Sequence, residues 1–189
     1  MTVASLTHAQ WEDTRTSTPP QRAFDDAFVA QFEAHFQRVR RFIGRLSGDY
    51  ELADDITQDA FVRLYRRGVL PDAPGQWLIT VALNLLRNAA TSRRRRGKLL
   101  TVSRGEALHS DPAPAPDHSS GATDSRARVR AAIRKVPERE RRMLLLLADG
   151  YSYREIATVL DINEGSVGTL LARAKRQFRD AYGDPIDAC

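Results

Sequence analysis

The stretch Tyr151–Tyr182, which reads YSYREIATVLDINEGSVGTLLARAKRQFRDAY, decides the fold of this chain. Ser152, with Glu155 three positions later, has the pattern of a capping box and predicts the start of a short helix. After a polar break, Asn163 or Ser166 caps a second, longer helix whose apolar residues recur at helical spacing. A short helix, a turn and a longer helix predict a helix-turn-helix, which places its second helix in the major groove of DNA.

The outer face of the second predicted helix is basic, and its cationic residues are Arg173, Lys175, Arg176 and Arg179. Such residues suit contacts with DNA phosphates. They also suit the dipole at the C-terminal end of any helix, and two amphipathic helices around a turn are common. This stretch alone leaves both interpretations open.

The composition indicates a soluble globular protein, and its positive charge is compatible with a polyanionic partner without establishing one. The 189 residues are 42% hydrophobic and 28% charged, with a formal net charge of +5. Cys189 is the one cysteine, so neither an internal disulfide nor a zinc-type cysteine cluster is possible, and we expect no metal and no cofactor. The sequence has no long apolar stretch and no signal-peptide pattern at its start, so we expect a cytoplasmic protein without membrane insertion.

Three helices are predicted within residues 24–98. The first has apolar residues at every third or fourth position, which predicts a buried stripe made of Phe24, Phe28, Phe32, Phe36, Val39, Ile43 and Leu46. The second has an acidic, polar face that carries Asp54, Asp55, Gln58 and Asp59. Because no histidine or third ligand accompanies these carboxylates, a solvated face or a docking face for a protein partner is favoured over a metal or acid–base site.

The third predicted helix begins at Trp77 and runs into the basic segment Arg93–Lys98. A basic run at a helix end is often only solvated. Here it follows indole and amide side chains, a combination that suits phosphate contacts and base stacking, so nucleic acid is favoured.

Changes in composition divide the chain into five parts. We predict a flexible N-terminal tail at 1–23, a helical domain at 24–98, a flexible proline-bearing linker at 99–123, a second helical domain at 124–183 and a C-terminal tail at 184–189. The predicted fold class is therefore all-α, with two small helical domains.

Two blocks of the sequence resemble a sigma-70-type RNA polymerase sigma factor of the extracytoplasmic-function (ECF) group. ELADDITQDAFVRLYRRG, followed by QWLITVALNLLRN and the arginine run, resembles sigma region 2. VPERERRMLLLLADGYSYREIATVLDINEGSVGTLLARAKRQF resembles sigma region 4. Two blocks in the family order are far more specific than either one alone.

The resemblance implies a role for each group of residues. The segment that docks on core RNA polymerase would be Asp54, Asp55, Gln58 and Asp59. The residues that contact the −10 promoter element would be Trp77, Asn84, Arg87, Asn88, Arg93 and Arg94. The helix-turn-helix, at about residues 153–172, would bind the −35 element through Arg154, Ser166, Gly168, Thr169, Arg173 and Arg176.

Several positions depart from the family pattern. Leu83 stands where the family often has arginine in the promoter-melting helix, and Asn88 where an aspartate is common. Asp161 replaces a common glycine in the turn but tolerates a left-handed conformation. Gly168 stands where a basic residue is frequent. These differences leave the promoter sequences open.

The resemblance implies that the chain is a non-catalytic transcription initiation factor, whose partners are core RNA polymerase, promoter DNA and, as in many family members, an anti-sigma factor. The alternative is a stand-alone helix-turn-helix regulator, in which residues 24–98 sense a signal or dimerise. An enzyme is the least favoured class, since the sequence has no nucleotide-binding glycine loop, catalytic triad or metal cluster.

Overall fold

The computed structural model describes residues 19–103 and 122–183, and all of its regular secondary structure is helical. The described helices are α1 (Pro19–Ser47), α2 (Tyr50–Arg67), α3 (Pro74–Ser103), α4 (Ala122–Lys135), α5 (Glu138–Ala148), α6 (Tyr153–Leu160) and α7 (Glu164–Tyr182). The prediction of an all-α fold is confirmed. In these ranges, no helix combines the length and the hydropathy that a membrane crossing needs.

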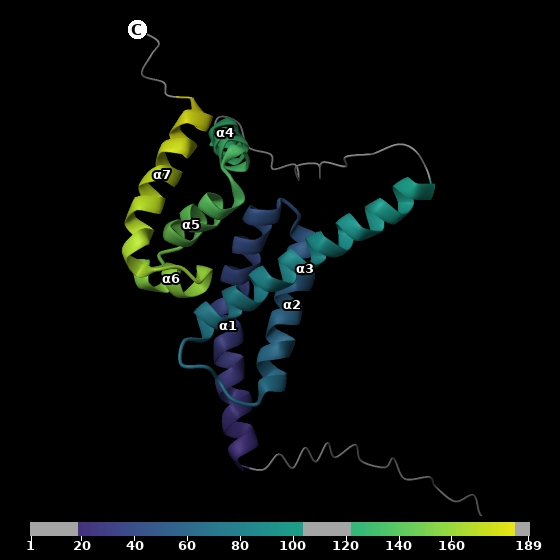
Figure 1. Cartoon of the computed structure of the whole chain (residues 1–189). Coiled ribbons are helices and arrows are strands. Elements are labelled where there is room, and N and C mark those ends of the chain that lie inside the picture. The colour runs from purple at the N-terminus through teal and green to yellow at the C-terminus, as the bar shows by residue number, and fades with distance from the viewer. Residues whose placement is uncertain (1–18, 104–121, 184–189) are drawn as a thin grey trace, which may run out of the picture.

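Helices α1, α2 and α3 pack against one another as the first bundle (Figure 1). Its centre holds the fully buried side chains Phe42, Ile43, Leu64, Leu78 and Ile79. On α1 the buried residues Val39, Phe42, Ile43 and Leu46 recur at helical spacing, so burying them removes one face of this helix from water.

The aromatic stripe of α1 is only partly buried, which corrects the prediction of a core stripe. Val39, Ile43 and Leu46 are buried, but the side chain of Phe32 is 41% exposed. Phe32 packs edge-on against Phe61 of α2, with ring centroids 5.1 Å apart. Among the described residues, no third helix covers the N-terminal half of α1 (Figure 1), and Phe28 and Phe32 line an open groove with α2.

Helices α4 to α7 form the second bundle, in which α7 packs against α4, α5 and α6. The predicted capping box is present: the Ser152 hydroxyl accepts the Glu155 amide, and the Glu155 carboxylate accepts the Ser152 amide. Asn163, one of the two predicted caps of the longer helix, begins α7. Asp161 ends α6 in the left-handed region, with φ 52°. Aspartate therefore adopts here the left-handed conformation that it was expected to tolerate.

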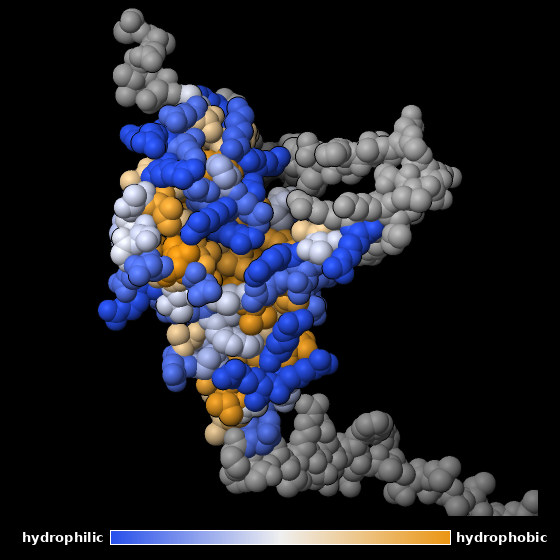
Figure 2. All heavy atoms as spheres, viewed as in Figure 1, coloured by the Kyte–Doolittle hydropathy of each residue, from blue (hydrophilic) through white to orange (hydrophobic). Residues whose placement is uncertain are grey.

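The two bundles also pack against each other, through α3 with α6 and α1 with α5. Their buried side chains join in one hydrophobic cluster that reaches from Val39 of α1 to Leu171 of α7. Figure 2 shows hydrophobic residues gathered where α5 and α6 meet α3, with hydrophilic residues around them.

The helices extend beyond the predicted boundaries. Helix α1 begins at Pro19, inside the predicted tail, and α3 begins at Pro74 rather than Trp77. Helix α3 continues to Ser103 and α4 begins at Ala122, so both enter the predicted linker from its ends. The rest of the predicted tail and linker, and residues 184–189, lie outside the described residues.

Candidate nucleic-acid interface

Three of the four polar residues predicted on α2 lie together on an exposed face. Asp55, Gln58 and Asp59 are exposed. Their spacing of three and four residues makes them neighbours on the helix surface. They therefore form an acidic stripe that faces solvent, beside the groove lined by Phe32 and Phe61.

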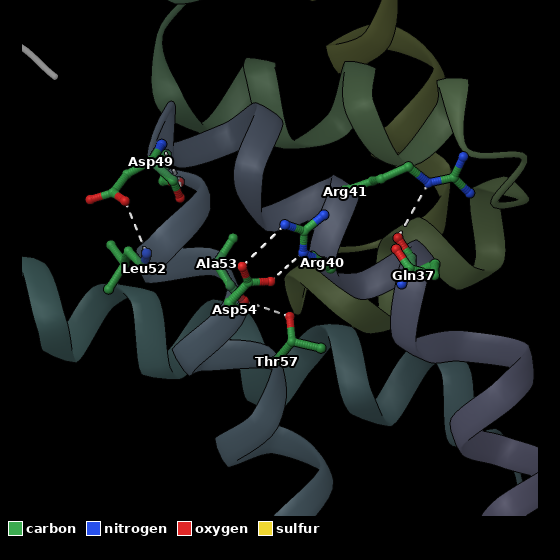
Figure 3. A network of polar contacts seen from close by, with 9 residues as sticks. Gln37, Arg40, Arg41, Asp49, Leu52, Ala53, Asp54 and Thr57 are labelled. Carbon is green, nitrogen blue, oxygen red and sulfur yellow. Dashed lines mark hydrogen bonds and ion pairs between the residues drawn. The ribbon is translucent and has the colours of Figure 1, made fainter. Parts of the chain in front are cut away.

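The fourth, Asp54, is engaged within the first bundle. Its carboxylate forms an ion pair with the guanidinium of Arg40 on α1, including a bond of 3.1 Å from Nη2 to Oδ2 (Figure 3). The hydrogen bond from Arg40 lowers the pKa of Asp54. Asp54 thus joins α1 to α2, and its carboxylate is engaged by Arg40, whereas those of Asp55 and Asp59 face solvent.

The start of α2 is connected to the basic end of α3. Asp49 caps α2 by accepting the Leu52 amide at 2.9 Å, and its other oxygen accepts from Arg93 at 3.2 Å. The hydrogen bond from the Leu52 amide, together with Arg93, lowers the pKa of Asp49. Arg93 was predicted to contact DNA; its side chain is 63% exposed, so it keeps surface for a further partner.

A polar stripe runs along α3. Trp77, Asn84 and Asn88 are spaced seven and four residues apart and therefore lie on one side of the helix. Asn84 and Asn88 are exposed, whereas Trp77 is half-buried, with the Arg67 guanidinium 6.0 Å from its ring centroid. Arg87 is exposed and donates to the Asn84 side-chain oxygen. The structure thus brings together the indole, amide and guanidinium groups predicted for the −10 contact, while the side chain of Arg94 lies outside the described residues.

Helix α7 presents a second polar stripe. Ser166, Thr169, Arg173 and Arg176 are exposed at intervals of three and four residues, on the side opposite the buried Val167, Leu171 and Ala174. Gly168 differs from this set, because it is half-buried and faces α6. A Cβ added there would lie 3.7 Å from the Tyr153 ring. That distance is an ordinary van der Waals contact, so the packing of α6 on α7 does not require glycine here, and Gly168 lies off the exposed stripe.

Two arginines of the helix-turn-helix are oriented by carboxylates. Arg154 on α6 is 83% exposed and lies 3.5 Å from Glu164 at the start of α7. Arg173 lies 3.8 Å from Glu140 of α5, whose side chain is only 10% exposed. Arg154 is held beside the start of α7 and Arg173 lies on α7, and both keep exposed surface, as a phosphate or base contact requires.

Arg139 is a candidate contact that the sequence did not indicate. It is exposed at the start of α5 and lines a hollow at the turn together with Ser166 and Thr169. In the sequence it stands 27 positions before Ser166, among residues that suit a helix start. Only the packing of α5 on α7 brings it to the exposed stripe.

Both bundles are similar to known proteins. The family model for sigma-70 region 2 matches residues 31–96, and the model for sigma-70 region 4 matches residues 126–178. The ECF RNA polymerase sigma factor SigE of Mycolicibacterium smegmatis is 34% identical over 77% of this chain and 58% of its own length. The RNA polymerase sigma-H factor of Pseudomonas aeruginosa is 30% identical over 88% of this chain and 90% of its own length.

A solved structure has the same fold. The sigma factor RpoE of Bartonella quintana, crystallised with the anti-sigma factor NepR, matches 82% of this chain and 96% of its own, with a TM-score of 0.61 and 21% identity. This chain spans 58% of the length of the SigE relative. The region 2 match covers most of the first bundle, and the region 4 match covers most of the second.

Proposed function

Since this chain belongs to the sigma-70 family of RNA polymerase sigma factors, in its ECF group, we propose that it is a transcription initiation factor that binds core RNA polymerase and directs it to particular promoters. One observation carries the proposal: two separate exposed polar stripes, on α3 and α7, lie in the regions that match sigma regions 2 and 4.

The acidic stripe of α2 is the proposed docking surface for core polymerase. Asp55, Gln58 and Asp59 face solvent and have no ion pair among the interactions of the described residues. Charged rims of this kind steer association and fix its register. The adjoining groove adds apolar surface, including Val62, which is 44% exposed.

The α3 stripe is the proposed −10 contact. Strand separation at a promoter costs a few kcal/mol per unstacked base, and a side chain that stacks or hydrogen-bonds with the base offsets that cost. Asn84 and Asn88 offer amides for base edges, Trp77 offers an aromatic face, and Arg87 offers a cation for phosphate. The chain would thus supply binding groups rather than a chemical step.

The α7 stripe is the proposed −35 contact. Ser166 and Thr169 reach only a short way from the helix, so they would contact bases where α7 lies closest to the groove floor. Arg173 and Arg176 reach further, to guanine or to phosphates. Arg154 would contact the backbone beside the turn.

Run-off transcription tests this function. Purified core polymerase is given a pool of genomic promoters with and without the chain, and start sites are mapped. We expect start sites that require the chain and share upstream −10 and −35 sequences. Tight binding of the chain alone to duplex operators, with no new start sites, would instead support the stand-alone regulator.

An anti-sigma factor is the further partner that we propose, because the RpoE structure was obtained with one. Affinity purification of the tagged chain from its own cells tests for it. Recovery of a stoichiometric partner besides polymerase subunits is expected, and recovery of polymerase subunits alone would exclude a dedicated anti-sigma factor under those conditions.

A further inference from the structure

A hollow of about 380 Å³ lies where the C-terminal end of α1 and the start of α2 meet α4, α5 and α7. Its wall on the second bundle is apolar and is formed by Ile133, Leu144, Leu145, Ala148 and Phe178. Pockets that bind small molecules are mostly apolar concavities of about 300–1,000 Å³. The hollow is therefore large enough for a small organic molecule.

The opposite wall of the hollow belongs to the first bundle and includes Gly44, Gly48 and Tyr50. Gly44 lies directly beside the Tyr50 ring, since a Cβ added to Gly44 would lie 2.5 Å from the Cε1 atom of that ring. The Arg40 guanidinium lies 5.8 Å from the centroid of the same ring. Glycine at position 44 thus makes room for the ring, and these two contacts hold Tyr50 as one side of the hollow.

Two large apolar side chains at the hollow remain open to solvent. Val129 of α4 is 42% exposed and Tyr50 of α2 is 45% exposed, and both line the hollow. One exposed apolar residue is ordinary, because folded proteins keep much apolar surface in contact with water. Two of them on one apolar hollow leave surface that a ligand with an apolar part would remove from water.

The charged side chains at the hollow all have the same sign. Arg45, Arg130 and Arg134 line it, and no acidic side chain of the described residues does so. Arg45 is already paired with Asp149. Arg130 and Arg134 are exposed and have no ion pair among the interactions of the described residues. Since they stand four residues apart on α4, they are neighbours on the helix surface, and guanidinium groups bind carboxylates through paired N–H donors.

We propose that the hollow is a binding site for a medium-chain fatty acid, whose alkyl chain lies against α5 and Phe178 and whose carboxylate accepts from Arg130 and Arg134. A neutral apolar molecule would leave both guanidinium groups without a partner, and a cationic one would be repelled by them. The groove between α1 and α2 suits this ligand less, because the carboxylates of Asp55 and Asp59 lie beside it. The inference goes beyond the proposed function and does not depend on it.

Calorimetric titration of the purified full chain tests the site. Decanoate, kept below its micelle concentration, should bind saturably with one molecule per chain. From hexanoate through octanoate to decanoate, each added methylene should strengthen binding about fourfold, because it buries further apolar surface. Octanol and octylamine should bind about tenfold more weakly than octanoate, because they form no charge-assisted hydrogen bonds with the arginines. Equal binding of the three head groups would overturn the proposal.

Two pairs of substitutions on α4 separate the site from the overall charge of the chain. Arg130→Gln with Arg134→Gln removes two cations that line the hollow and should weaken decanoate binding about tenfold. Arg126→Gln with Lys135→Gln is the matched control, because both residues are exposed on the same helix, the net charge changes equally and neither lines the hollow. An equal loss in the two chains would mean that only net charge attracts the fatty acid, and the site would be wrong.

Filling the hollow tests where the alkyl chain lies. Val129→Trp enlarges a lining side chain that is already 42% exposed, so the helical circular dichroism of the chain should not change. Decanoate binding should fall about tenfold, because the indole occupies volume that the alkyl chain needs. Undiminished binding would place the fatty acid elsewhere and overturn the proposal.

Nuclear Overhauser effects locate the fatty acid in the unsubstituted chain, so this measurement does not depend on the folding of any variant. Decanoate labelled with carbon-13 should show effects to the methyl groups of Ile133 and to the ring of Phe178, which both line the hollow. Their absence from a saturated complex would overturn the site.

Discussion

At the scale of single residues, two identical side chains can have different roles, depending on which residues of other helices lie next to them. Asp54 and Asp55 are adjacent in sequence, yet Asp54 is paired with Arg40 and Asp55 faces solvent. The sequence predicts the acidic character of α2 but not this division, because Arg40 approaches from another helix. Arg139 was missed for the same reason.

The two aspartates predict separable effects. Asp54→Asn should lower the thermal midpoint of the chain, because it removes the carboxylate charge that joins α1 to α2. Asp55→Asn should leave the midpoint within experimental error and weaken binding to core polymerase. Calorimetry and a polymerase-binding titration measure the two effects. The reverse pattern would contradict the assignment of Asp54 to structure and Asp55 to docking.

Arg139 predicts a change in salt dependence. If it contacts a DNA phosphate, Arg139→Ala should weaken binding of the polymerase complex about equally across −35 sequences, and should reduce the slope of log affinity against log salt by about 1. Fluorescence anisotropy at several salt concentrations measures this. The control is Arg63→Ala, which removes an exposed arginine of α2 and changes the net charge by the same amount. An equal change of the salt slope in both variants would show that only net charge matters.

At the scale of elements, the caps of the helix-turn-helix are what the sequence predicted best, because a cap is a local structure. The Ser152 capping box, the Asn163 cap and the left-handed Asp161 all follow from residues within a few positions. The lengths of α1 and α3 and the exposure of Phe32 did not follow, because they depend on whether another helix covers a given turn.

The cap of α2 predicts a pH-dependent stability. Asp49 has a pKa below its ordinary value of 3.8 in the folded chain, so its charged form stabilises the fold at neutral pH. That stability is complete above the unfolded-state pKa and is lost as the pH falls through the lower folded-state pKa. Asp49→Ala should cost about 1 kcal/mol at pH 7.

Urea unfolding at pH 7 and near pH 2 measures this effect. Asp49→Asn is the control, because asparagine still caps but carries no charge. Its free-energy difference from the native chain should be present at pH 7 and shrink at the lower pH. A difference that does not change with pH would show that the charge of Asp49 is not involved.

At the scale of the whole molecule, the two bundles share one buried cluster although the sequence predicts them as separate domains. The contacts that join them link residues about a hundred positions apart, such as Arg38 and Asp149. No local pattern marks such a pair. The family resemblance predicted the order of the two regions along the chain. The contact between them could be seen only in the structure.

A shared core predicts cooperative unfolding. Leu171 of α7 is 1% exposed, and Leu171→Ala should cost about 2–5 kcal/mol. The fluorescence of Trp77, in a Trp11→Phe chain, reports on the first bundle. If the bundles unfold together, this substitution in the second bundle should shift the Trp77 transition to lower urea. An unchanged Trp77 transition would show that the bundles unfold independently.

The backbone conformation of the turn between α6 and α7 also restricts which amino acids evolution can place at position 161. Asp161 is the one described residue other than glycine with a positive φ, at 52°. Backbone in that region excludes β-branched side chains almost entirely and accepts glycine, asparagine and aspartate. If every amino acid were introduced at this position and cells were selected for transcription, deep sequencing should recover those three. A population rich in valine or isoleucine would mean that the turn can be rebuilt.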